Sequence, residues 1–419
     1  MSSRIRVAII GCGGITSAHL RGIKILQDAG IDDVEVTVLC SRKEESARRY
    51  NDRHDAAPPL PPIAPFRDDP VNIRDVYLTD LKPGKPAKVC TNWREAVLDP
   101  NVDAVIVLAT VEVHHSIGLG AMAAGKHVCI EKPFAITVRA ARRLCEMADQ
   151  KGLSLGVAES LRYKPETRAT RWALDSGYIG HLEMVAQMGI GGGWAPDKIV
   201  GKTGWRHVKR RTGGGILMDV GAHVFDKVRY LCGEPKRIAG VVRTIEPLRT
   251  TRSETGEIID RVTCDVEDTA FATIIFENDA IGTFSMSWAG HGEETSVPGG
   301  MVLYGDLGCI QNGHIISDHQ GTLPLQDSFE HQAGSGLKKR WFPGGVTDAF
   351  ALELHEFFEA IRRKRQPETS GLEGLRDVAV GYGIIESSYR GEAVEFSAIE
   401  SCEIENYQRP INDFHGLRT

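Results

Sequence analysis

The sequence lacks long apolar runs, paired cysteines and any excess of positive charge. No segment approaches the roughly 18 consecutive apolar residues that a membrane-spanning helix needs, so we expect no membrane partner. The 419 residues include 50 lysines and arginines against 56 acidic residues, a formal net charge of -6. This balance offers no basic surface to nucleic acid or to an anionic membrane. A strand-like apolar segment begins within the first few residues, so we expect no signal peptide.

The nine cysteines are scattered along the chain, and none belongs to a Cys-x-x-Cys pair. The odd number and the spacing suggest neither a disulfide framework nor a structural zinc site. Most of these cysteines stand in apolar runs, where a reduced cysteine behaves as a small buried hydrophobe. The pattern indicates a reducing, cytoplasmic setting, and we expect no metal site.

The first third of the chain alternates apolar runs with helix-compatible stretches. Apolar runs fall at residues 6–10, 34–39, 104–109 and 127–130, and the stretches between them include 15–29, 44–50 and 113–124. Continuous apolar strands separated by helices are typical of a parallel sheet that is covered on both faces. This part of the sequence therefore predicts an α/β domain.

Prolines concentrate between residues 51 and 90, where 58–62 read Pro-Pro-Leu-Pro-Pro. Proline donates no backbone hydrogen bond and fixes φ, so this segment cannot form a helix or the interior of a sheet. We expect a Pro-rich insertion over about residues 54–89 that runs extended over the surface. A role at a subunit interface or over the active site is the alternative.

The pattern changes after about residue 150. The segments 269–276 and 281–288 alternate in period two around Asn278-Asp279, which predicts a hairpin in an antiparallel sheet with two different faces. A late apolar stripe over 349–363 predicts a helix.

A glycine-rich turn follows the first predicted strand directly. Gly11, Gly13 and Gly14 permit a tight turn in which backbone N–H groups can approach a pyrophosphate at a helix N-terminus. Ile15 and Thr16 complete the turn, although Thr16 stands where glycine or alanine is usual. The strand–turn–helix context favours dinucleotide binding over a purely structural turn.

The end of the second predicted strand lacks the acidic residue that usually binds the adenosine ribose of NAD. Ser41, Arg42 and Lys43 stand there instead, and a hydroxyl with two cations suits a 2′-phosphate. We therefore expect NADP(H) as the preferred cofactor, with NAD(H) possible. The alternative is that Arg42 and Lys43 form the charged start of a solvated helix.

Two motifs indicate proton and hydride chemistry. Lys132 follows Glu131 at the C-terminal end of a predicted strand, where ligands bind in open α/β sheets, and the following proline restricts its backbone. Asp219 and His223 are spaced to share one helix face. His223 could exchange a hydroxyl proton while Asp219 orients it, and Lys132 could polarise the same oxygen.

The rival interpretations of these motifs are structural or metal-binding. Lys132 could be a surface lysine at a turn. Asp219 and His223 could be a histidine satisfied by a local carboxylate in the core, or two metal ligands that lack an evident third. Trp205 and Arg206 lie just upstream in a glycine-rich stretch.

On the basis of these and further motifs, the chain resembles the Gfo/Idh/MocA oxidoreductases over essentially its whole length. The motifs that carry the resemblance are the glycine turn continuing to His19, Ala124-Gly125-Lys126-His127-Val128 before Glu131-Lys132-Pro133, Arg162-Tyr163, the Gly-Gly-Gly-x-Leu-x-Asp-x-Gly-x-His run at 213–223, and the stretch 370–377. The resemblance implies an N-terminal Rossmann domain over residues 1–135. A C-terminal α+β domain over 136–419 would then carry a large open, mainly antiparallel sheet, through which a homodimer or homotetramer forms.

The resemblance also implies the reaction and the roles of the residues. The reaction would be hydride transfer between a nicotinamide and a secondary alcohol of a sugar, glycoside or cyclitol. Lys132 and His223 would be the catalytic pair, assisted by Asp219. Thr110, His114, Glu131 and Lys132 would contact the cofactor, whereas Tyr163, Trp205, Arg206, Asp219 and His223 would contact the substrate. Thr110 replaces a proline that is frequent in the family.

Two other function classes remain open at this point. One is a glycosidase that oxidises its sugar transiently, eliminates the aglycone and reduces the sugar again. The other is a nicotinamide-sensing regulator without catalysis, although such a protein would be expected to lose Lys132 or His223, and both residues are present.

Overall fold

The computed structural model describes residues 4–52, 76–191, 203–253 and 255–418 of the chain. The chain divides into two compact units. The first comprises Met1–Ile136, Ala140–Tyr163 and Lys339–Leu375, and the second comprises Thr137–Arg139, Lys164–Lys338 and Arg376–Thr419. The first unit thus includes the late segment 339–375, which the expected linear division after residue 135 assigns to the other domain.

The first unit is built on a parallel sheet. Its strands are β1 (Ile5–Ile10), β2 (Val34–Cys40), β3 (Lys88–Cys90), β4 (Ala104–Val107), β5 (His127–Glu131) and β6 (Leu155–Ala158). Within the described residues they form one sheet in the order β3-β2-β1-β4-β5-β6, and every neighbouring pair is parallel. This is the doubly wound order of a Rossmann fold, as the sequence predicts. The strand order reverses between β1 and β4, which is where such sheets bind their ligands.

The helices of this unit include α1 (Thr16–Asp28), α2 (Glu44–Asn51), α3 (Trp93–Leu98), α4 (His114–Ala123), α5 (Val138–Lys151) and α13 (Ala349–Arg362), with single turns at η3 (Leu78–Asp80), η4 (Val111–Val113) and η5 (Ser160–Tyr163). Parallel crossovers are right-handed. The helix after β1 and the helices after β4 and β5 therefore cover opposite faces of the sheet.

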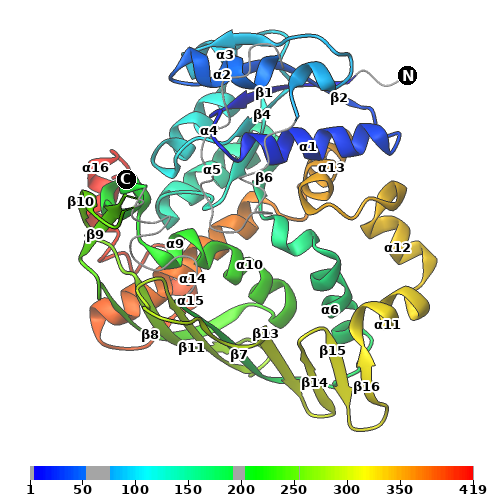
Figure 1. Cartoon of the computed structure of the whole chain (residues 1–419), viewed down its shortest axis with the longest axis vertical. Coiled ribbons are helices and arrows are strands. Elements are labelled where there is room, and N and C mark those ends of the chain that lie inside the picture. Colours follow the sequence, from blue (N-terminus) through cyan, green and yellow to red (C-terminus); the bar gives the residue numbers. More distant parts are fainter. Residues whose placement is uncertain (1–3, 53–75, 192–202, 254, 419) are drawn as a thin grey trace. The chain divides into compact units, whose positions relative to one another are not determined.

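The predicted helix at 349–363 is confirmed as α13, and it packs against α1 (Figure 1). Gly22 on α1 allows this close approach, because a Cβ there would lie 3.0 Å from the backbone nitrogen of Ala351. The aromatic ring of Phe350 meets the imidazole of His19 edge-on, with ring centroids 5.6 Å apart. The late segment therefore completes the core of the first unit.

The second unit is built on a large, mainly antiparallel sheet. Its strands are β7 (Leu182–Ile190), β8 (Pro235–Arg243), β11 (Thr269–Phe276), β12 (Ile281–Ser287), β13 (Thr295–Gly305), β14 (Gly308–Gln311), β15 (His314–Ser317), β16 (Gly321–Pro324) and β17 (Val394–Glu395). Across the described residues their order is β16-β15-β14-β13-β7-β12-β11-β8-β17, and only β7 and β12 pair in parallel. The predicted hairpin is confirmed as β11 and β12, and Asp279 takes a positive φ of 63° in its turn.

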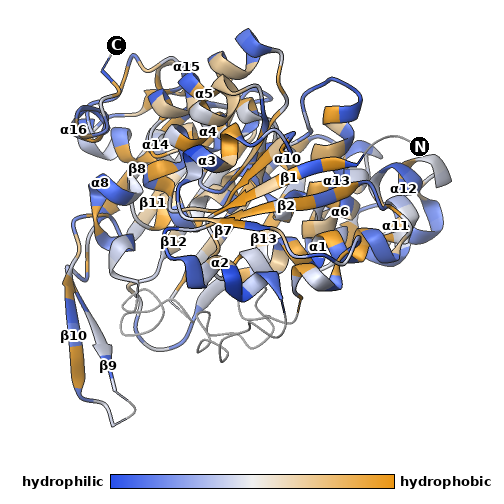
Figure 2. Ribbon diagram, turned by 90° about the horizontal axis from the view of Figure 1, so that it is seen from above, coloured by the Kyte–Doolittle hydropathy of each residue, from blue (hydrophilic) through white to orange (hydrophobic). Residues whose placement is uncertain are grey.

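Helices and a small arm complete the second unit. The helices are α6 (Pro165–Asp175), α8 (Lys209–Thr212), α9 (Ile216–Asp219), α10 (Gly221–Cys232), α11 (Leu325–Gln332), α15 (Phe396–Glu400) and α16 (Arg409–Phe414), with a single turn at η7 (Gly204–His207). Helices α12 (Ser335–Trp341) and α14 (Gly371–Arg390) cross from one unit to the other, and the single turn η8 (Pro343–Gly345) belongs to the late segment of the first unit. Two further strands, β9 (Leu248–Arg252) and β10 (Ile258–Thr263), pair only with each other and project from this unit (Figure 2).

Most of the expected Pro-rich insertion lies outside the described residues, since the description resumes at residue 76. The part that is described contains η3 and leads into β3, so it is not extended throughout.

Among the described helices, none is both long and apolar enough to cross a bilayer.

Candidate active site

The glycine turn closes the gap between β1 and α1 at the carboxyl end of the parallel sheet. Gly11 has a φ of 103°, and a Cβ on it would lie 2.4 Å from the backbone nitrogen of Ala109, so only glycine fits there. The hydroxyl of Thr16 donates to the Gly11 carbonyl oxygen at 3.2 Å, and the Tyr50 hydroxyl donates to that of Gly13 at 2.6 Å. Thr16 thus closes the turn in place of the usual small residue.

This turn fits a dinucleotide pyrophosphate. Gly13 is exposed, and nothing lies within 4 Å of the position that a Cβ would take on it. The turn leads directly into α1, and the N–H groups of Thr16 and Ser17 donate to the carbonyl oxygens of Gly13 and Gly14 at 3.3 Å. The positive end of the helix dipole faces the turn, which favours an anion there.

Ser41, Arg42 and Lys43 follow the carboxyl end of β2, beside this turn. The backbone N–H of Ser41 donates to the carbonyl oxygen of Cys90 at 3.2 Å, which ties the segment to β3. Both cationic side chains are exposed, and Lys43 is the N-cap residue of α2. Cations are unfavourable at a helix N-terminus unless an anion binds nearby.

Glu131 ends β5, and it is held by a histidine from α1. His19 Nε2 lies 3.4 Å from Glu131 Oε1, and the imidazole is fully buried. His19 Nδ1 has no hydrogen-bond partner among the described residues, so the ring contacts the carboxylate through Nε2 alone. Lys132 comes next, partly buried, at the same edge of the sheet as the glycine turn.

His114 connects the segments that follow β4 and β5. Its Nδ1 lies 3.0 Å from the carbonyl oxygen of Pro133, and its Nε2 lies 2.8 Å from that of Ala109. Burial lowers the pKa of this imidazole, while the two carbonyls oppose that shift. His114 therefore holds the loop after β4 to the loop after β5. Thr110, in the first of these loops, donates to the Glu112 carboxylate at 3.2 Å.

In the second unit, three predicted site residues lie together. The Arg206 Nε donates to Asp219 Oδ2 at 2.7 Å, and both side chains are about one-fifth exposed. The Arg206 guanidinium also lies over the Trp205 ring, 4.4 Å from its centroid. Arg206 therefore joins the η7 turn to the end of α9.

His223 lies one turn beyond Asp219. The residue between α9 and α10, Val220, has helical dihedral angles (φ -83°, ψ -39°), so the chain continues from one helix into the next with little change. His223 is partly buried, and its spacing from Asp219 is the expected i, i+4.

Tyr163 belongs to the first unit and is only 2% exposed. Its hydroxyl lies 3.3 Å from the Thr369 hydroxyl, and the ring packs in the hydrophobic core. These are the contacts of a core residue, and its contact with substrate stays a prediction. In the described part of the chain, no three metal-ligating side chains gather into a group that could hold an ion.

One residue of this region escaped the sequence analysis. Glu267 is buried two residues before β11, and its carboxylate accepts hydrogen bonds from the turn that begins α9. The only signal in the sequence is an acidic pair, Glu267-Asp268, directly before an apolar strand.

Comparisons with known proteins agree with this architecture. Residues 5–159 match the model of an oxidoreductase family with an NAD-binding Rossmann fold, and residues 167–311 match the Gfo/Idh/MocA C-terminal domain. The 1,5-anhydro-D-fructose reductase of Ensifer adhaerens is 28% identical over 320 residues, which cover 76% of this chain and 86% of that protein. The levoglucosan dehydrogenase of Pseudarthrobacter phenanthrenivorans is 25% identical over 332 residues, covering 74% and 84%.

A solved structure of levoglucosan dehydrogenase with NADH and levoglucosan matches 94% of this chain and 99% of its own, with a TM-score of 0.68 and 20% identity. At that identity the likeness concerns the fold alone. The two family models together cover the whole parallel sheet, the large sheet from β7 to β14, and the predicted motifs at 131–133 and 213–223. The chain therefore belongs to the Gfo/Idh/MocA family of oxidoreductases.

Proposed function

We propose that this protein is a nicotinamide-dependent dehydrogenase or reductase that acts on a secondary alcohol of a sugar, glycoside or cyclitol. The observation that carries the proposal is the arrangement at the carboxyl edge of the parallel sheet. The glycine turn, Glu131 and Lys132 lie at this edge, and His19 on α1 reaches Glu131 across 3.4 Å. A cofactor anchored at the turn would therefore have a lysine at the same edge of the sheet. The named relatives act on an anhydrofructose and on levoglucosan, which supports a sugar-like substrate.

When bound, the nicotinamide supplies the hydride acceptor or donor, and the chain's own residues handle the proton. In the oxidative direction His223 accepts the proton of the substrate hydroxyl. Lys132 stabilises the negative charge that develops on the same oxygen. Asp219 orients His223, while Arg206 fixes the carboxylate of Asp219 through the 2.7 Å contact.

We infer that NADP(H) is preferred over NAD(H). Ser41 is a hydrogen-bond donor, and Arg42 and Lys43 are exposed cations at the carboxyl end of β2. A 2′-phosphate would pair with these groups, and none of the residues at 41–43 is acidic.

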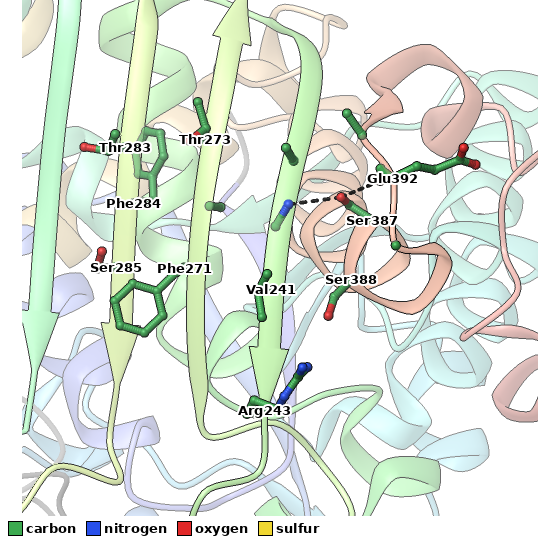
Figure 3. A pocket seen from close by; sticks show the side chains of 15 residues that line it. Val241, Arg243, Phe271, Thr273, Thr283, Phe284, Ser285, Ser387, Ser388 and Glu392 are labelled. Atoms are coloured by element: carbon green, nitrogen blue, oxygen red, sulfur yellow. Dashed lines mark hydrogen bonds between the residues drawn. The ribbon is translucent and has the colours of Figure 1, made fainter.

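The chain further fits a homodimer or homotetramer formed through the open face of the large sheet. On that face Val241, Phe271 and Ser285 are cross-strand partners on β8, β11 and β12 (Figure 3). Val241 is 51% exposed and Phe271 is 49% exposed. A hollow of about 660 Å³ lies over these strands. Exposed apolar patches of this kind mark association surfaces.

We also place the protein in the reducing cytoplasm. All nine cysteines lie in the described ranges as free thiols, and free thiols persist where disulfides are kept reduced.

The decisive experiment replaces Lys132 with methionine. We expect Lys132→Met to leave binding of NADPH nearly unchanged and to abolish turnover when sugars and cyclitols are screened at 340 nm. The matched control is Lys126→Met at the amino end of the same strand, where the ammonium donates to the carbonyl oxygen of Val102 at 2.7 Å. This control should keep its turnover. Normal turnover in Lys132→Met would refute the assignment, and glycoside cleavage without net absorbance change would instead favour the transient-oxidation glycosidase.

A further inference from the structure

Glu267 holds the turn from which the catalytic helix of the second unit begins. Its Oε1 accepts the backbone N–H of Gly215 at 2.8 Å and that of Leu217 at 3.2 Å. Its main-chain oxygen accepts the N–H of Ile216, also at 3.2 Å. Three consecutive N–H groups at the start of α9, which have no partner within the helix, are thus satisfied by one residue.

The glycines before α9 make this contact possible. A Cβ on Gly215 would lie 1.7 Å from the main-chain oxygen of Glu267, and a Cβ on Gly214 would lie 3.3 Å from each carboxylate oxygen. Any larger residue at 215 would push the turn away from the start of β11. Gly214 and Gly215 therefore serve this packing, in a part of the chain far from the cofactor turn in sequence.

The contacts of Glu267 with the turn at 215–217 determine where the residues after that turn lie. Asp219 ends α9, and Val220 carries the helical path into α10, which bears His223. A shift of the turn at 215–217 would therefore move both side chains. Misplacement of a reacting group by about 1 Å can lower a rate on the order of 100-fold.

We propose that Glu267 is a positioning residue that sets the placement of Asp219 and His223 through the first turn of α9. The inference rests on the proposed function, because it takes His223 as the proton acceptor. It assigns Glu267 no contact with substrate or cofactor.

The surroundings of Glu267 determine which substitutions test this role. Its second oxygen, Oε2, is buried and accepts no hydrogen bond from a described residue. The titratable groups that act on it electrostatically include Asp268 beside it, Cys264, Lys209 on α8, Tyr382 on α14 and Tyr407. Glutamine keeps an acceptor at Oε1 and removes the charge, whereas alanine removes the acceptor.

Asp268 provides the matched control, because it is equally buried and adjacent in sequence but holds a different segment. Its carboxylate accepts the N–H groups of Ile245 and Glu246 at 2.9 and 2.8 Å and pairs with Arg249 at 2.9 Å. Asp268→Asn should therefore destabilise the connection between β8 and β9 and leave the α9 turn in place.

The experiment measures kcat, the Kd of NADPH, thermal stability and hydrogen–deuterium exchange of the peptide 213–223 in the full-length enzyme. We expect Glu267→Ala to lower kcat about 10- to 100-fold, to speed exchange in that peptide and to leave the Kd within about twofold. Glu267→Gln should restore kcat and slow exchange, and Asp268→Asn should lower stability with kcat and exchange near wild type. Should Glu267→Ala fail to fold, Glu267→Asp, whose side chain is one methylene shorter, takes its place with the same expectation.

Wild-type kcat in Glu267→Ala, or a kcat in Glu267→Gln as low as that of the alanine variant, would overturn the inference. The variant His223→Asn separates this result from a failure of the proposed function. If His223→Asn retains full turnover, the proposed role of His223 as proton acceptor and the positioning role of Glu267 both fall. If His223→Asn is inactive while Glu267→Ala is fully active, only the positioning role is lost.

Discussion

Arg206 and Asp219 form an ion pair that joins two predicted site residues from different elements of the second unit. The Nε–Oδ2 distance is 2.7 Å, and the guanidinium is stacked on Trp205 at the same time. The pair thus restrains the Asp219 carboxylate one helical turn before His223, and it keeps Arg206 from turning freely into solvent. Arg206 is consequently a structural partner of the catalytic helix as well as a candidate contact for substrate hydroxyls.

Replacing Arg206 with alanine should affect substrate more than cofactor. The variant loses the ion pair and the stacking contact, so we expect the KM for substrate to rise at least about tenfold. The pair is one-fifth exposed, and the loss of unfolding free energy should be only about 1 kcal/mol. Steady-state kinetics and urea denaturation measure both effects. Arg171→Ala, which removes an exposed pair with Asp175 in the same unit, should leave KM unchanged. Equal KM values in the two variants would contradict the role.

The sequence predicts those parts of the molecule that depend on local pattern. Apolar runs separated by helical stretches are enough to indicate the parallel sheet. The glycine turn is visible in the sequence because the backbone requires glycine there, since a Cβ on Gly11 would meet Ala109. The hairpin of β11 and β12 is also predicted from local pattern, because the alternation of apolar and polar residues is a property of neighbouring positions. Asp219 and His223 are likewise predicted from their spacing of four.

Contacts between distant segments could not be predicted in this way. Helix α13 was expected, but its packing against α1 depends on Gly22 and on the tertiary meeting of His19 with Phe350. Glu267 binds a turn some fifty positions earlier in the chain, and neither its spacing nor its neighbours reveal that target. The pairing of Arg206 with Asp219 is also a consequence of folding, although each residue was singled out separately.

Removing the cations after β2 should weaken NADPH binding selectively. We expect Arg42→Ala and Lys43→Ala each to raise the Kd of NADPH about tenfold, equivalent to about 1.4 kcal/mol, and to change the Kd of NADH less than twofold. Fluorescence titration of each reduced cofactor measures these constants. Arg48→Ala is the control, since Arg48 lies on α2 and pairs with Glu44. If both cofactors weaken equally, the two cations do not recognise a 2′-phosphate.

The buried carboxyl of Glu267 should make stability depend on pH. Burial raises its pKa to about 7 in the folded protein, above the value of about 4.3 expected in the unfolded chain. The folded state therefore binds this proton more tightly, and the resulting stabilisation is complete below about pH 4.3 and is lost as the pH rises through 7. At about 1.4 kcal/mol per pKa unit, the loss approaches about 4 kcal/mol.

The comparison of wild type with Glu267→Gln isolates this contribution, because every other titrating group is common to both proteins. Urea denaturation at pH 5, 6, 7 and 8 should show the unfolding free energy of wild type falling relative to that of the variant as the pH rises. A constant difference over this range would mean that Glu267 does not titrate there.

Charge on the open face of the large sheet should break the proposed oligomer. Phe271 is half exposed on β11, between Val241 on β8 and Ser285 on β12, and a second copy of the chain would bury it. We expect Phe271→Glu to shift the mass measured by sedimentation velocity from dimer or tetramer to monomer, because an unpaired carboxylate in an apolar interface is costly. Phe414→Glu is the control, since Phe414 is 60% exposed on the helix α16 and does not line the hollow over β8, β11 and β12. An unchanged mass in Phe271→Glu, or equal dissociation in both variants, would exclude this face as the interface.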